Sequence, residues 1–276
     1  MLIDAIMKEH SDRKRPDAVF KIQNVADYSW ADPKFFEAGY IENCFSYRLP
    51  FPLVWFEFRS PKIASFADRM SCGTLAWIEE YEPSGHAFNI LSFFDFRGQI
   101  RCLGGIGILI DESYKAIPNS VFLLRRPDEL VRVLGFRFLE PTGKDVTDEL
   151  PDEKFSLANL PIITTALNFL HCRNVDIVEN HIPAKLIRAN IKRGKERPYF
   201  EKYYTLEIEP MKQILNKEGQ AQSIGIKKAF HICRGHFKTY DEKPLFGKHR
   251  GTIWTPAHVK GSVERGVIKK DYEIKI

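Results

Sequence analysis

Histidine is concentrated near the C-terminus of this 276-residue chain, where arginine and lysine lie beside it. Four of the eight histidines fall within the 31 residues that end at Gly261. Imidazole exchanges protons near neutral pH, and a neighbouring cation stabilises the negative charge that develops on a phosphorane. A metal-independent ribonuclease needs this inventory, with His231 or His236 as base and acid. The candidate catalytic residues are His231, Arg234, His236, Lys248, His249, Arg250 and His258.

The same segment also has the composition of a surface that binds a nucleic acid without cleaving it. Lysine and arginine contact phosphates, and aromatic rings offer surfaces on which bases stack. We favour binding over catalysis, while a third interpretation gives these residues no shared role beyond core packing and exposure to solvent. The candidate binding residues of this segment are Phe237, Lys238, Tyr240 and Trp254, with Phe246 as a further ring.

Several side chains in this segment are chemically able to bind zinc, namely His231, Cys233, His236, His249 and His258. However, the chain contains no Cys-x2-Cys pair and no His-Glu-x-x-His helix, which are typical of zinc sites. The carboxylates beside the histidines are limited to Asp241 and Glu242. The spacing therefore predicts no metal site, and no other motif predicts a cofactor.

A second basic segment follows Pro183 and predicts a short helix that ends near residue 193, with Gly194 as its cap. Lys185, Arg188 and Lys192 fall at positions i, i+3 and i+7 and form one stripe beside an apolar face. Such a stripe suits contacts with phosphates along a groove, although a solvated helix face is the alternative. The candidate nucleic-acid-binding residues here are Lys185, Arg188, Lys192, Arg193, Lys195 and Arg197.

Charge is distributed unevenly along the chain, whose formal net charge is +5. From Lys185 to Gly261 there are 17 lysines and arginines against 7 aspartates and glutamates, so this segment carries +10 and the remainder −5. A field of this kind attracts polyanions, among which nucleic acid is the commonest. We therefore predict a DNA or RNA partner. Docking on an acidic host protein is the alternative of a different class.

The C-terminal motif resembles one found in a group of bacteriophage and bacterial mobile-element proteins. In that group a basic helix precedes a His-x-x-Arg-Gly-His-Phe/Trp-Lys/Arg motif, and a glycine-bounded basic stretch, a tryptophan and a final glycine follow. The similarity covers about residues 160 to 261, and it implies a phage or mobile-element context without a particular chemistry, since the group has no settled activity. The matching positions are Lys192 to Lys195, His231, Arg234 to Lys238, Gly247 to Gly251, Trp254, His258 and Gly261.

Residues 50 to 140 predict a mostly antiparallel sheet with a helix against it. Apolar runs alternate with turn residues, and Asp95 to Gln99 has the composition of a hairpin connection. A helix is expected after Ser60, with Gly73 at its end. Three glycines between residues 104 and 107 lie inside a strand-like run, so they indicate a bulge or tight packing rather than a phosphate loop. The expected strands are 53–58, 74–81, 87–96, 100–110 and 121–124.

The rest of the chain is expected to contain helices, short strands and loops. The first 48 residues predict helical pieces and loops, and the polar segment 141–153 predicts a loop or domain boundary. A helix is expected at about 159–171, and strands at 199–208, 227–233 and 252–259. The predicted class is α+β, with a mostly antiparallel sheet and packed helices followed by a smaller basic α+β module. The expected domains are a sheet-rich domain at 1–150 and the basic module at 151–276.

Composition disfavours other classes of protein. No run is long enough to span a membrane, and the first 16 residues lack the apolar core of a signal peptide. Five scattered cysteines indicate reduced, buried thiols rather than a disulfide framework. These features predict a cytoplasmic protein. No Gly-x-Ser-x-Gly elbow supports a serine hydrolase, and the acidic runs predict solvated surface.

Overall fold

The computed structural model describes residues 1–9, 15–31, 41, 43–60, 70–81, 85–96, 99–124, 159–208, 229–233, 235–245, 247–255, 258–260 and 262–267. The chain forms two compact units, of which the first contains residues 1–170 and 177–206 and the second residues 171–176 and 207–276. The basic helix after Pro183 therefore groups with the first unit. The domain boundary expected at residue 150 and the helix expected after Ser60 lie outside the described residues.

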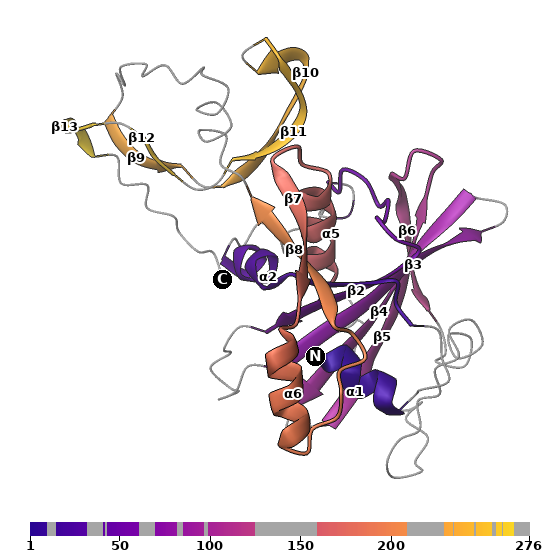
Figure 1. The fold of residues 1–276 in the computed structure, drawn as a ribbon. Coiled ribbons are helices and arrows are strands. Elements are labelled where there is room, and N and C mark those ends of the chain that lie inside the picture. Colours follow the sequence, from indigo (N-terminus) through magenta and orange to yellow (C-terminus); the bar gives the residue numbers. More distant parts are fainter. Residues whose placement is uncertain are drawn as a thin grey trace. The chain divides into compact units, whose positions relative to one another are not determined.

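A mixed sheet is the framework of the first unit (Figure 1). Its eight strands are β1 (Ala18–Lys21), β2 (Leu53–Arg59), β3 (Ser71–Tyr81), β4 (Gly85–Phe96), β5 (Gln99–Ile110), β6 (Ala116–Leu124), β7 (Val175–His181) and β8 (Lys202–Ile208). They are ordered β6-β5-β4-β3-β2-β1-β8-β7. Strands β2 to β6 form an antiparallel meander, whereas β1 is parallel to both β2 and β8. The predicted class and the mostly antiparallel sheet are confirmed, but β1 and β7 were not predicted.

Helix α1 (Leu2–Glu9) packs on one face of the sheet, where its apolar side chains are buried among those of β2, β3 and β4. On this face the indole of Trp55, which is 1% exposed, lies across the neighbouring strand above Gly73. A Cβ atom on residue 73 would overlap the Cζ2 atom of that indole. The prediction that Gly73 ends a helix is wrong: the residue lies inside β3, where it leaves space for a large ring.

Helices α2 (Gln23–Ala31) and α5 (Leu160–Leu170) contact each other through an edge-on pair of Tyr28 and Phe169, with ring centroids 6.1 Å apart. Asn159, at the start of α5, donates to the Thr74 hydroxyl at 3.5 Å, on the sheet face opposite α1. Residues 160 to 169 of α5 are all buried, which explains the apolar sequence that predicted this helix. No helix within the described ranges is long and apolar enough to cross a membrane.

The glycine run of β5 forms a bulge and a close contact, as predicted. Ser92 of β4 pairs with Gly104 and Phe93 pairs with Cys102, so one extra residue lies between them in β5. Gly104 has a φ of +103°, which residues with a Cβ atom rarely adopt. A Cβ atom on Gly107 would overlap the ring of Phe122 in β6. These glycines therefore shape the sheet.

Apart from the turn at residues 171–174, the described part of the second unit consists mainly of strands. β10 (His236–Leu245) and β11 (His249–Thr255) form an antiparallel ribbon. β9 (Ala229–Cys233), β12 (His258–Lys260) and β13 (Ser262–Val267) form a separate sheet in the order β12-β9-β13. The strand expected at 227–233 corresponds to β9. The single strand expected at 252–259 is wrong, because its residues are divided between β11 and β12, which pair with different partners.

Three of the cysteines, Cys44, Cys72 and Cys172, are buried and are not part of a disulfide. Removal from water disfavours the thiolate, and this burial raises the pKa of each thiol to about 12. Because the thiolate is the reactive form of cysteine, these three side chains are structural rather than nucleophilic.

Candidate functional site

Helix α6 (Ala184–Lys192) forms where the sequence predicts it. The carbonyl of Pro183 accepts a hydrogen bond from the Leu186 N–H at 2.8 Å. Gly194 ends the helix with a φ of +76°, and its N–H donates to the carbonyl of Ile191 at 2.9 Å. Ile187 is the one buried residue of this helix. The basic stripe is therefore presented to solvent by a helix that packs through a narrow contact.

The cations of α6 and of the turn after it are exposed and largely unneutralised. We call this group of five side chains the α6 surface: Lys185, Arg188, Lys192, Arg193 and Lys195. Within the described part of the chain, none of the five forms an ion pair with a carboxylate. The nearest acid in sequence, Glu196, pairs instead with Lys8 at 3.0 Å. Their charge therefore remains available to an external anion.

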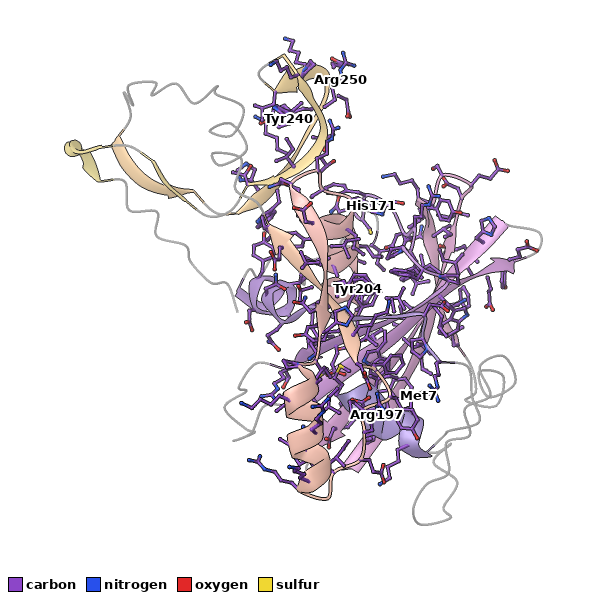
Figure 2. All side chains as sticks on the ribbon, in the orientation of Figure 1. Met7, His171, Arg197, Tyr204, Tyr240 and Arg250 are labelled. Carbon is purple, nitrogen blue, oxygen red and sulfur yellow. The ribbon has the colours of Figure 1, made fainter. Side chains whose placement is uncertain are left out.

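Arg197 differs from the other candidates of this segment. Its Nε donates to Glu201 Oε1 at 2.5 Å, and this hydrogen bond raises the pKa of the Arg197 guanidinium. Arg197 is labelled at the loop beyond α6 in Figure 2. Its charge is partly compensated, so we leave it out of the α6 surface.

Two aromatic rings pack together at the open end of the ribbon of the second unit. Phe237 of β10 lies opposite Trp254 of β11, and their ring centroids are 4.6 Å apart. Trp254 is only 3% exposed, and Phe237 is half-buried. The prediction that Trp254 offers a stacking surface to bases is wrong, because its ring is occupied in packing. Phe237 is engaged in the same contact, and Phe246 lies outside the described residues.

Two residues of the segment 171–176 hold the ribbon in place. The Asn174 amide donates to the carbonyl of Trp254 at 2.7 Å and accepts from the Trp254 N–H at 2.8 Å. The Arg173 N–H donates to the Thr252 carbonyl at 2.9 Å, and Arg173 Nη1 donates to the Arg250 carbonyl at 2.6 Å. Arg173 also crosses Gly251, which has a φ of +103° and no side chain in the way. The sequence did not indicate either residue, because neither carries a recognisable motif.

Replacing Asn174 with alanine should destabilise the ribbon by about 2 kcal/mol, because two buried backbone groups of Trp254 lose their partner. Hydrogen exchange of the Trp254 amide should become faster while amides of β3 and β4 keep their rates. Asn180→Ala is the matched control, since Asn180 makes its hydrogen bonds to Val178 and Thr205 in the first unit. Unchanged exchange at Trp254 would contradict this role for Asn174.

The ribbon also carries exposed cations. We call Lys238, Lys248 and Arg250 the ribbon surface; all three are exposed and none pairs with a carboxylate among the described residues. The ammonium group of Lys238 lies 4.8 Å from the ring centroid of Tyr240, which is half-buried. Figure 2 labels Tyr240 and Arg250 on the two strands. Lys248 lies in the turn between the strands.

The candidate catalytic histidines are divided between the two sheets of the second unit. His236 pairs with Thr255 at one end of the ribbon, and His249 pairs with Leu245 at the other end. These two imidazoles are therefore not an acid–base pair for one reaction centre. In the other sheet, His258 lies opposite Cys233 in register, and His231 lies opposite Lys260. Arg234 lies outside the described residues.

Among the described residues, no three His, Cys, Asp or Glu side chains are placed to hold a metal ion. Comparison of the chain with protein-family models, with curated proteins and with solved structures finds no match. The α6 surface and the ribbon surface are therefore the features of the described chain that bear on its function.

Proposed function

We propose that this protein binds nucleic acid through phosphate contacts made by the α6 surface and by the ribbon surface. The observation that carries the proposal is that the eight lysine and arginine side chains of these two surfaces are exposed and have no carboxylate partner in the described part of the chain. Cations that are not neutralised internally bind phosphates and release the counterions of the nucleic acid. The two surfaces belong to different compact units, and each contributes by itself.

Contacts with phosphates, rather than with bases, should dominate the affinity. Trp254 and Phe237 are packed against each other, so among the rings of the ribbon they add little stacking. A two-stranded ribbon and an exposed helix are both elements that fit the major groove of a duplex. Cations that reach only phosphates fix the position of a protein on the duplex but carry no sequence information. We therefore expect binding that is largely independent of sequence.

Titration of the intact chain into fluorescently labelled DNA and RNA at several salt concentrations tests this proposal. We expect log affinity to fall linearly with log salt, with a slope of about −0.9 for each duplex phosphate that is contacted. Unrelated sequences of equal length should give the same slope. Polyglutamate of similar length serves as the comparison, because it carries carboxylates in place of phosphates.

Two results would contradict the proposal. The first is the absence of binding to DNA and RNA even at low salt. The second is equal binding of polyglutamate and nucleic acid, since a surface with no preference for phosphate fits an acidic protein partner better.

A further inference from the structure

A basic pocket in the first unit lies beyond the C-terminal end of α6 and was not indicated by the sequence. It is a shallow hollow of about 540 Å³. Three stretches of chain line it: residue 15, the end of β7, and the loop before β8 together with the first residue of β8. The lining residues are Arg15, His181, Arg197, Pro198, Tyr199, Glu201 and Lys202. Four of these seven side chains are basic and one is acidic.

Glu179 of β7 orders two of the basic side chains of this pocket without lining it. Its carboxylate accepts hydrogen bonds from the Tyr204 hydroxyl at 2.9 Å and from Lys202 Nζ at 3.2 Å. It also lies 3.0 Å from Nε2 of His181. These contacts, the Tyr204 hydrogen bond first, lower the pKa of the Glu179 carboxyl. A carboxylate that stays ionised holds Lys202 and His181 beside the hollow.

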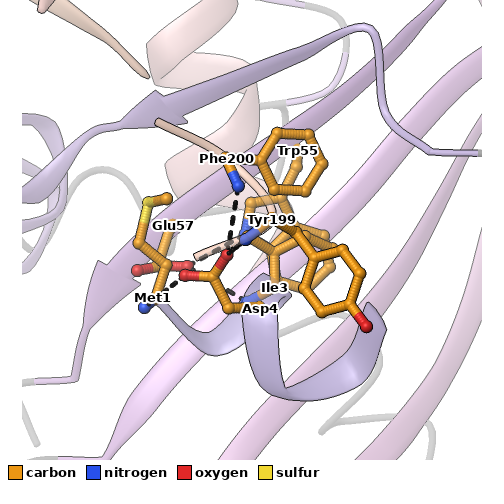
Figure 3. Close-up of polar contacts among 7 residues, drawn as sticks. All are labelled: Met1, Ile3, Asp4, Trp55, Glu57, Tyr199 and Phe200. Atoms are coloured by element: carbon orange, nitrogen blue, oxygen red, sulfur yellow. Dashed lines mark hydrogen bonds and ion pairs between the residues drawn. The ribbon is translucent and has the colours of Figure 1, made fainter. Parts of the chain in front are cut away.

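The aromatic wall of the pocket is fixed by a contact with α1. Asp4 Oδ1 accepts hydrogen bonds from the backbone N–H groups of Tyr199 at 2.9 Å and Phe200 at 3.3 Å (Figure 3). The guanidinium carbon of Arg15 lies 5.2 Å from the centroid of the Tyr199 ring. Arg15 has no ion pair with a carboxylate among the described residues. A planar cation held on a ring keeps its N–H groups directed outward to an anion.

With His181 neutral, Arg15, Arg197 and Lys202 carry three positive charges against the two negative charges of Glu179 and Glu201, so the hollow has a formal net charge of +1 and suits an anion. A phosphodiester carries one charge, whereas a phosphomonoester carries about two near neutral pH and presents three acceptor oxygens. Arginine forks and a lysine ammonium group bind such oxygens through charge-assisted hydrogen bonds. The hollow falls within the usual range of small-molecule sites, so it has room for an organic group attached to the phosphate.

We propose that this pocket binds a phosphomonoester, either that of a free nucleotide or that at the phosphorylated 5′ end of a nucleic-acid strand. Arg15, which has no carboxylate partner among the described residues, contacts the phosphate oxygens, and Tyr199 supports it. Arg197 bonds Glu201 through its Nε and Lys202 bonds Glu179, so the Nη groups of Arg197 and a further N–H group of Lys202 complete the contacts. The site belongs to the first unit and does not depend on binding by the ribbon. Binding of a free nucleotide would persist if the broader proposal of nucleic-acid binding were wrong.

Two pairs of ligands test this site on the intact chain. Calorimetry compares AMP with adenosine, and fluorescence anisotropy compares 5′-phosphorylated with 5′-hydroxyl strands of one sequence. We expect the phosphate to strengthen binding by about tenfold in at least one pair, as for charge-assisted hydrogen bonds. Preference for AMP assigns the site to free nucleotides, and preference confined to the strands assigns it to a strand end. Equal binding within both pairs overturns the proposal.

Variants locate the effect. Arg15→Gln and Arg197→Gln should each remove most of the preference for the phosphorylated ligand, because each removes a guanidinium group that contacts the phosphate. Both side chains are exposed, so we expect both variants to fold. Lys115→Gln is the matched control, an exposed lysine at the turn between β5 and β6. Thermal unfolding of each variant verifies folding. A preference that survives both arginine substitutions shows that the phosphate binds elsewhere and overturns the assignment.

Discussion

Replacing Gly73 with alanine should destabilise the first unit by about 3 kcal/mol, which lowers the ratio of folded to unfolded chain by roughly a hundredfold. The added methyl group would occupy the position of the Trp55 indole, which is buried under α1. Backbone strands on both sides of Gly73 prevent the residue from moving away, since it pairs with Glu57 and Phe93. The ring must therefore shift.

The shift of Trp55 would reach further than one contact. Its Nε1 donates to Glu57 Oε2 at 3.2 Å, and the same carboxylate oxygen accepts from the Ile3 N–H of α1 at 3.4 Å. The ring also packs against Phe93, with centroids 5.6 Å apart. Displacement of the indole therefore disturbs the packing of α1 on the sheet as well as the sheet face itself.

Denaturant unfolding of single and double variants measures this effect. Trp55→Phe alone should also destabilise, because a smaller ring leaves a void and the Glu57 bond is lost. In the double variant the smaller ring makes room for the methyl group, so the two changes should cost clearly less together than the sum of the separate changes. Gly194→Ala is the control: its φ is positive but no atom lies within 4 Å of a Cβ, so a cost of about 1 kcal/mol is expected. Strict additivity for the pair at 55 and 73 would refute the steric account.

The antiparallel meander could be predicted because each of its strands is recognisable from its own short stretch of sequence. Strands β2 to β5 are long apolar runs bounded by turn residues, and the glycines of β5 interrupt such a run where a bulge is formed. β1 was not predicted because four residues are too few to show a strand pattern, and it forms a strand through its pairing with β2 and β8. β10 escapes it because most of its side chains are exposed and polar, so it shows no apolar period.

The two basic surfaces differ in how far they could be predicted. α6 has a glycine cap and an amphipathic pattern, both of which are local, and its exposed stripe follows from them. The histidine cluster could not be predicted in this way, because residues that are close in sequence can lie at opposite ends of a pair of strands. The ribbon places His236 and His249 at opposite ends because a full strand separates them.

The pocket beyond α6 could not be predicted at all. Arg15, His181 and Lys202 come from three segments that meet only through the sheet topology. Trp254 was predicted to stack on bases because it is an aromatic residue in a basic segment. In the structure its backbone N–H donates to Asn174 and its ring packs against Phe237. The backbone of Trp254 is held by Asn174, which lies 80 positions away in the chain.

Exchange of the stripe cations Lys185, Arg188 and Lys192 for glutamine should weaken nucleic-acid binding by about a hundredfold near 0.1 M salt. Each lost phosphate contact removes about 0.9 from the slope of log affinity against log salt, so three contacts remove nearly three units. The three side chains are exposed and make no ion pair with a described carboxylate, so stability should change little. Salt titrations of wild type and variant provide both quantities.

The corresponding ribbon variant, with glutamine in place of Lys238, Lys248 and Arg250, separates the contributions of the two units. If both surfaces contact phosphates, each variant lowers the slope and the combined variant lowers it by the sum, because the surfaces lie on different units and share no partner. Arg48→Gln combined with Lys115→Gln, which removes exposed charge from other parts of the first unit, should leave the slope within one unit of wild type. An equal loss in this control would mean that net charge alone drives binding. An unchanged slope in both triple variants would exclude these side chains as the phosphate contacts, whatever the affinity of the intact protein.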